Sequence, residues 1–461
     1  MAATAVEVHN GFRTGLFLFG VMVIAAGVGV AAAWDATLGV AGCLALIAVP
    51  TAVVRPHLVP HLLMVSVFSA SLEVGGTLTI GRAVAPLGLL AVAVYVLQHP
   101  VKFKHSGLLV GLACAYGILA FASLWWSVDT YATVDALITL GVSIGYGATF
   151  AILIRNERDL RTLLWVAVCS SVGLAILWIA AYASGVDRRF NEAGDPNFFA
   201  ALQVATIPLV LVLASQSRSQ MQKLGLGIAI TIMAGSIIST LSVGGVVTMA
   251  VAGLVIFLLP ANNMFRSRSQ KGAYLLAALV GLGLLFGIAQ EDFNRRLEMK
   301  LEAEDVGDAR RDLWSAALNG YEQRPWTGLG YGGFYASSFQ LLRTTPGVDI
   351  ESHLRFIDVG EYVHNAYIGS LAELGPLGLL VFTGMLLAAV RALRRAARRA
   401  ELSGEEFKRK TANALLVSLI AFSVSSFLLS TETSRMLWML LGLTVAVAKM
   451  TEVPEGAGAR A

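Results

Sequence analysis

Residues 163–182 read LLWVAVCSSVGLAILWIAAY, twenty consecutive positions without a charged side chain. A helix needs about 20 apolar residues to cross a bilayer, so this stretch indicates a membrane span. Similar runs recur throughout the 461-residue chain, in which 56% of residues are hydrophobic and 14% are charged. Ordinary soluble domains have roughly 25% charged residues. With a mean hydropathy of +0.70, the composition excludes a soluble enzyme, a disordered protein and a disulfide scaffold.

Fourteen apolar runs are candidate spans, although several are short or adjoin one another. Within residues 36–73 and 224–260, two neighbouring runs could merge or re-enter the membrane. We therefore predict an all-α polytopic membrane protein with about 12 transmembrane helices, in a range of 12–14. The candidate runs are 14–33, 36–54, 58–73, 83–98, 107–125, 132–154, 161–183, 197–214, 224–240, 241–260, 272–289, 364–390, 411–430 and 434–449.

Basic residues cluster in short loops between the apolar runs, as the positive-inside rule predicts. With the N-terminus inside, the loops near Arg55, Arg155 and Arg218 and the segment 391–410 all become cytoplasmic. We therefore expect both termini in the cytoplasm, and a first span that is retained rather than removed as a signal peptide. The net charge of +4 then reflects membrane topology and not a nucleic-acid partner.

The apolar runs divide the chain into three parts. Residues 1–289 are expected to form an N-terminal transmembrane bundle with a short outer loop at 184–197. Residues 290–363 form a large outer loop containing helices, and residues 364–461 contain C-terminal transmembrane helices and a short cytoplasmic tail. Because long loops in compact proteins are usually functional, the large outer loop is the first place to look for a site.

The large outer loop contains a helical pattern followed by a glycine-rich turn. From about Asp308 apolar residues recur at helical spacing, which predicts an amphipathic helix with Trp314 on its membrane-facing side. Residues 326–334, WTGLGYGGF, break this helix and suit a tight turn. The glycines also fit G-x-G-x-x-G, but no strand precedes them, so we interpret them as a structural turn and not a nucleotide site.

Paired arginines occur in both outer loops, as Arg188 with Arg189 and as Arg310 with Arg311. They depart from the charge rule that the other loops obey. The planar guanidinium group suits phosphate oxygens, so the pairs indicate an anionic ligand such as a lipid-linked diphosphate. A salt-bridged surface is the alternative, because acidic residues lie among these arginines.

Other polar residues lie where the outer loops enter the membrane. Asp195 and Asn197 flank Pro196 at the start of a span, where an aspartate can also simply cap the helix. His364 begins a later span, which contains the acid Glu373. A histidine can accept a proton from a hydroxyl near neutral pH, and ionisable groups inside spans are functional hypotheses. A plain interfacial histidine is the alternative.

Four motifs together resemble the O-antigen ligase/polymerase superfamily of membrane glycosyltransferases. The segment 188–197 is also similar to that superfamily's shorter loop, and the resemblance extends to the order of spans and loops. The four motifs are RDLW at 311–314, RPWTGLG at 324–330, HNAY at 364–367 and ELGPLG at 373–378.

The resemblance implies a metal-independent glycosyltransferase without a cofactor in the inner membrane of a Gram-negative bacterium. Its large loop would be periplasmic, its donor a glycan on undecaprenyl diphosphate and its acceptor lipid A–core oligosaccharide. The implied catalytic residues are His364, Arg311, Arg188 and Arg189, and the doubled arginines leave open which member of each pair acts. The implied substrate-binding residues are Arg310, Asp195, Asn197, Trp314, Asn365, Tyr367 and Glu361.

Three other functions are compatible with parts of this pattern. A polymerase that extends glycan on its lipid carrier shares the same motifs. An oligosaccharyltransferase acting on proteins often has a further C-terminal region, whereas we expect this chain to end soon after its last span. A transporter would need broken helices and polar residues near the midplane of several spans, but the polar residues here concentrate at one boundary.

Overall fold

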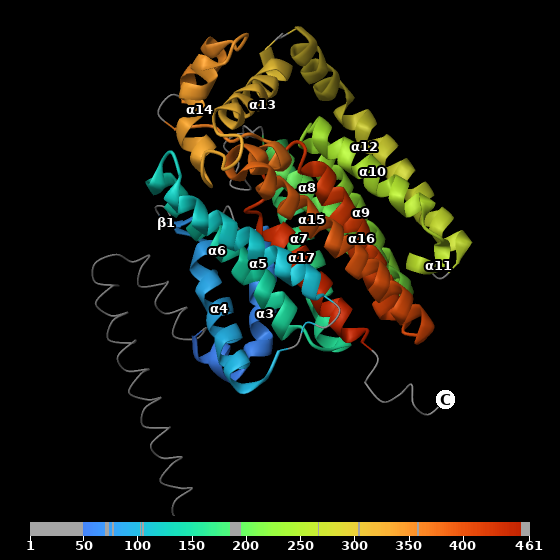
Figure 1. Cartoon of the computed structure of the whole chain (residues 1–461). Coiled ribbons are helices and arrows are strands. Elements are labelled where there is room, and N and C mark those ends of the chain that lie inside the picture. Colours follow the sequence, from blue (N-terminus) through green and yellow to red (C-terminus); the bar gives the residue numbers. More distant parts are fainter. Residues whose placement is uncertain are drawn as a thin grey trace, which may run out of the picture.

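The computed structural model is a bundle of long helices with a smaller helical layer at one end (Figure 1). It describes residues 49–69, 73–75, 78–101, 103, 106–184, 195–265, 267–302, 305–356 and 359–452. The bundle helices are α3 (Val59–Phe68), α4 (Ile80–Gln98), α5 (Gly107–Ala122), α6 (Thr130–Leu153), α7 (Glu157–Ala183), α8 (Pro196–Gln216), α9 (Gln220–Ser239), α10 (Val243–Leu258), α11 (Ala261–Met264), α12 (Arg268–Glu302), α15 (Ala366–Leu402), α16 (Glu406–Ser425) and α17 (Arg435–Met450).

The remaining elements are short or belong to the end layer. Two 3-10 turns, η1 (Pro56–Leu58) and η2 (Ser123–Trp125), adjoin bundle helices. The strands β1 (Glu73–Gly75) and β2 (Leu78–Thr79) pair antiparallel, a small departure from the predicted all-α fold. We call residues 305–356 the end layer, and its elements are α13 (Asp305–Gln323), α14 (Gly333–Thr344) and the 3-10 segment η4 (Ile350–Phe356).

The helices have the length and composition of a membrane protein, as predicted. Six of them in the described part of the chain are long and apolar enough to span a bilayer, and three shorter apolar helices accompany them. The candidate runs 14–33 and most of 36–54 lie outside the described residues. The total of about 12 spans therefore remains a prediction.

The apolar stretch 224–260 forms two helices and does not merge into one. Leu241 adopts a left-handed conformation with φ of 50°, which ends α9. The hydroxyl of Ser242 then accepts the backbone N–H of Gly245 at 3.0 Å and caps α10. Such a capping bond stabilises a helix start by about 1 kcal/mol, so two separate helices result.

One continuous cluster of buried apolar side chains fills the bundle. Among the packed pairs are α6 with α17, α8 with α16 and α15 with α5. Glycines allow the closest approach, because a Cβ atom on Gly442 of α17 would lie 2.3 Å from the carbonyl oxygen of Gly147 on α6. Small residues at such crossings let helices pack closely in a membrane, where the hydrophobic effect does not drive association.

Helix α12 runs through the predicted boundary between 289 and 290. It has 35 residues, about 52 Å at 1.5 Å per residue, so it is longer than the roughly 30 Å hydrocarbon core. The start of the predicted outer loop is therefore a continuation of a bundle helix, which reaches the end layer along one side of the molecule (Figure 1).

The end layer has its own small core, which rests on α15. Trp314, predicted to face the membrane, instead packs half-buried against this cluster, and its indole nitrogen is buried without a hydrogen-bond partner. The expectation was wrong because apolar side chains from α14 and α15 offer α13 a protein surface to cover. The buried members are Leu313, Ala316, Ala317, Leu329, Phe334, Leu341, Leu342, Val363 and Ala372.

Candidate functional site

The glycine-rich turn before α14 docks onto a break in α15. Gly375 interrupts that helix with φ of 68° and ψ of −169°. The break leaves two carbonyl oxygens of α15 free, and Leu329 and Gly330 donate their backbone N–H groups to those of Ala372 and Glu373, both at 2.9 Å. The predicted structural turn is thus confirmed, and its partner is the helix that begins next to His364.

The carboxylate of Glu373 completes this junction. One of its oxygens accepts the backbone N–H of Gly332 at 2.9 Å and the other accepts that of Phe334 at 3.3 Å. These N–H groups belong to the first turn of α14, where a helix favours a negative charge. Glu373, hypothesised to be functional as an acid inside a span, therefore anchors the end layer through both oxygens.

His364 lies at the turn that leads into α15. Its backbone is left-handed, with φ of 52°, which is uncommon for a residue with a side chain. Asn365 follows as the helix cap, and its side-chain oxygen accepts the N–H groups of Tyr367 and Ile368 at 3.0 and 3.1 Å. The backbone of Ala366 is bound to the carbonyl oxygens of Ser426 and Leu429 between α16 and α17. The His-Asn pair thus places the imidazole just outside a firmly held helix start.

Charged groups from two distant segments and from its own segment influence the His364 ring. Burial lowers its pKa, the carboxylates of Asp195 and Glu361 oppose this shift, and the guanidinium group of Arg310 adds to it. Burial also lowers the pKa of Arg310, with Asp195 again opposing. The structure therefore brings together four predicted site residues, from the start of α8, from α13 and from the segment before α15. The lowered pKa keeps the imidazole neutral and able to accept a proton near pH 7.

The two arginines of α13 differ in their surroundings. Arg310 is partly buried, whereas Arg311 is exposed. Consecutive residues of a helix point about 100° apart, so they cannot both face His364. The geometry places Arg310 in the charged group around His364. Arg188 and Arg189 lie outside the described residues.

Asp195 and Asn197 both make contacts that shape the start of α8. One oxygen of Asp195 accepts the N–H groups of Asn197 and Phe198 at 2.6 and 3.1 Å, so the capping interpretation is confirmed. The side-chain oxygen of Asn197 accepts the hydroxyl of Ser242, at the start of α10, at 2.7 Å. These bonds hold the starts of α8 and α10 together next to the His364 turn.

Tyr367 and Glu361 are also engaged within the protein. The Tyr367 hydroxyl donates to the carbonyl oxygen of Ser423 at 2.9 Å, and its ring lies 4.3 Å from that of Phe427. The Glu361 carboxylate lies 2.6 Å from the Nδ1 atom of His353. Tyr367 therefore packs into the bundle, and Glu361 is bound to a histidine that was not among the predicted site residues.

Glu432 is an acid that the sequence analysis did not select. It lies in the connection between α16 and α17, and one of its oxygens is 3.5 Å from where a Cβ atom of Gly369 would be. Its other oxygen is buried without a hydrogen-bond partner. Burial raises the pKa of Glu432 to about 7. The available signal was a single acid in the short polar stretch TETS, 431–434, between two apolar runs.

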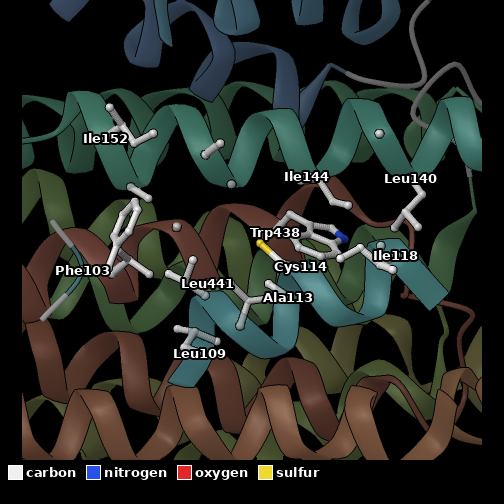
Figure 2. A pocket seen from close by; sticks show the side chains of 18 of the residues that line it. Phe103, Leu109, Ala113, Cys114, Ile118, Leu140, Ile144, Ile152, Trp438 and Leu441 are labelled. Carbon is white, nitrogen blue, oxygen red and sulfur yellow. The ribbon is translucent and has the colours of Figure 1, made fainter. Parts of the chain in front are cut away.

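A groove of about 580 Å³ lies between α5, α6 and α17 and contains none of the predicted site residues. Figure 2 shows Cys114, Ile144 and Trp438 among the side chains that line it. The lining is almost entirely apolar, so it offers no group for acid, base or phosphate chemistry.

The fold and the polar groups at one end of it define a helical membrane protein with a charged site at the junction of bundle and end layer. Residues 203–383 match the family model described as O-antigen ligase. Over that segment, the match confirms the resemblance to the O-antigen ligase superfamily seen in the motifs. The matched segment contains Arg310, His364 and Glu373, whereas Asp195 and Glu432 lie outside it. No curated protein gives a significant match to the sequence.

Proposed function

We propose that this protein is an O-antigen ligase that transfers glycan from undecaprenyl diphosphate to lipid A–core oligosaccharide without a metal ion. The reaction would take place on the periplasmic face of a bacterial inner membrane, with both termini in the cytoplasm. The family match supports the general class. The basic loops on the opposite side of the predicted spans support the orientation.

In the proposed reaction, a ring nitrogen of His364 accepts the proton of the acceptor hydroxyl. The hydroxyl oxygen then bonds to the first sugar carbon of the donor, and the bond from that carbon to the diphosphate breaks. Undecaprenyl diphosphate leaves with the bonding electrons, and the proton passes from His364 to solvent. A positioned base of this kind typically contributes a factor of roughly 10² to 10⁴ in rate.

Arg310 is proposed to neutralise the charge that develops on the leaving diphosphate. Fixed cations in a site shielded from water can lower a barrier by several kcal/mol. Arg188 and Arg189 are proposed to bind the same diphosphate from the shorter loop. Arg311, which is exposed, is proposed to contact the donor further from the reacting carbon.

One observation carries the proposal: His364 and the partly buried Arg310 lie close enough that the guanidinium group lowers the pKa of the ring. The shift of the His364 pKa has both burial and Arg310 among its causes. Transfer of a glycan from a diphosphate carrier to a hydroxyl requires a base for the hydroxyl and a cation for the diphosphate. The two groups must lie near each other to act on the same reaction.

A reconstituted assay tests the proposal. The purified protein is supplied with undecaprenyl-diphosphate glycan and lipid A–core in the presence of EDTA, and the products are separated on a gel. A single glycan addition to lipid A–core is expected for wild type, and none for His364→Ala. A ladder growing on the lipid carrier would instead indicate a polymerase. No transfer by folded wild-type protein would overturn the ligase proposal. Normal transfer by His364→Ala would overturn the proposed role of His364 as the base.

A further inference from the structure

His353 lies in the interior of the end layer, on η4. Only 1% of its surface is exposed, although it belongs to a polar segment of the sequence. Buried imidazoles need partners for their ring nitrogens, because an unpaired polar group away from water costs about 1–3 kcal/mol. The partners of His353 are two acids from different elements.

The two ring nitrogens face these acids on opposite sides. Nδ1 lies 2.6 Å from a carboxylate oxygen of Glu361, and Nε2 lies 3.5 Å from one of Asp312. The first is a short hydrogen bond, whereas the second is an ion-pair distance without hydrogen-bond geometry. Both acids are nearly buried, with side-chain exposures of 10% and 11%.

Each acid lies within three residues of a residue of the proposed site. Asp312 is two residues after Arg310 on α13, and Glu361 is three residues before His364. The backbone N–H of Glu361 donates to the hydroxyl of Ser338 on α14 at 2.9 Å, which fixes this segment on the end layer. His353 therefore touches both the helix that carries Arg310 and the segment that carries His364.

The bridge has a clear physical role. Two carboxylates shielded from water repel each other and lose hydration, and a histidine between them offsets both costs. Without the histidine, the acids would move apart or toward water and would carry their chain segments with them. A displacement of about 1 Å between reacting groups can reduce a rate by roughly 10²-fold.

We propose that His353, held between Asp312 and Glu361, is a positioning residue that sets the distance between Arg310 and His364. The inference rests on the proposed function, because it assigns those two residues to the transfer step. His353 does not contact substrate. It acts through the two segments that it joins.

The first test measures kcat and KM for the lipid-linked donor. His353→Ala and the milder Asp312→Asn should lower kcat by roughly 10- to 100-fold while KM changes by less than about threefold. His99→Ala is the matched control, because His99 directly follows α4, is exposed, stacks on Tyr95 and forms no ion pair with any acid in the described part of the chain. An unchanged kcat in both variants, or a loss confined to KM, would overturn the positioning role.

The second test needs no activity. Spin labels at the exposed positions Ser315 and Val359, in a chain whose cysteines are replaced, report the distance between α13 and the segment before His364. The distribution should be narrow in the parent and in His99→Ala, and broader or shifted in His353→Ala and Asp312→Asn. An identical distribution in all four proteins would overturn the bridge. Wild-type protein without transfer activity would count against the ligase proposal alone, since this distance is measured independently.

Discussion

The carboxylate of Glu373 and the backbone N–H of Gly332 are joined by a hydrogen bond of 2.9 Å. Glu373 lies just before the break in α15, and Gly332 is the N-cap residue of α14. One end of this bond is therefore on the helix that starts beside His364, and the other is on the end layer that carries Arg310. The acid therefore ties the helix that begins next to His364 to the layer that carries Arg310.

Removing this acid should destabilise the protein. Glu373→Ala leaves the part-buried N–H group of Gly332 and the buried one of Phe334 without partners, and the buried group alone costs about 1–3 kcal/mol. Glu373→Gln keeps one acceptor oxygen and should lower the unfolding temperature less. Thermal unfolding in detergent measures both, with the exposed Glu322→Ala as control. Equal unfolding temperatures for Glu373→Ala and the control would contradict the anchoring role.

The glycine at the start of the turn should tolerate no side chain. Gly328 has φ of 70°, and a Cβ atom there would lie 2.4 Å from the carbonyl carbon of Glu373. Gly347 has a similar φ of 79° with nothing near its Cβ position. Both alanine variants carry left-handed strain of roughly 1–2 kcal/mol, but only Gly328→Ala adds an overlap with backbone. Gly328→Ala should therefore have a clearly lower unfolding temperature than Gly347→Ala. Similar unfolding temperatures for the two variants would show that the turn can move away from α15.

The two arginines of α13 should differ in catalysis. Arg310→Ala should lower the transfer rate by about 10²- to 10³-fold, the usual cost of removing a group that stabilises developing charge. Arg311→Ala, which changes an exposed residue on the same helix, should have a smaller effect. Rates under saturating donor give the comparison. The reverse order would assign the diphosphate to Arg311.

The transfer rate should depend on pH through His364. Burial lowers the pKa of this ring, so the neutral base persists below the usual value of about 6.5, and the acidic limb of kcat/KM should lie below that pH. Asp195→Asn removes a carboxylate that raises the pKa and should shift the limb further down. Arg310→Gln removes a cation that lowers it and should shift the limb up, whatever its effect on the absolute rate. Limbs that coincide in all three proteins would rule out His364 as the titrating base.

Glu432 should make stability depend on pH. Its pKa rises from 4.5 to about 7 on burial, so the folded protein holds a proton that the unfolded chain has released in this window. Stability should therefore fall as pH increases from about 4.5 to about 7 and then level off. Glu432→Gln, which stays neutral, should lack this component. Unfolding temperatures of the wild type and Glu432→Gln are measured across this pH range. Parallel curves for the two proteins would contradict the predicted contribution of Glu432.

The sequence predicted local structure well at residue types that occur in few structural roles. Apolar runs, the glycines at 326–334 and the His-Asn pair predicted spans, a turn and a helix start. The sequence did not predict which side chains of a helix face the site, because this depends on how the helix is rotated in the fold. Whether Arg310 or Arg311 faces His364 is decided by the rotation of α13, and that rotation is set by a core shared with α14 and α15. His353 escaped notice for the same reason, because its two acids meet it only in the folded chain.

The number of residues in helix α12 fixes how side chains at its two ends are oriented relative to each other. Within the described residues it is one uninterrupted helix of 35 residues that contacts both α9 and α13. Inserting one residue would turn the rest of this helix by about 100°, whereas seven residues, close to two full turns, would nearly restore the direction of its side chains. Insertions and deletions in α12 should therefore be accepted in steps near seven residues, because only such steps keep the same helix face toward the bundle on both sides of the change.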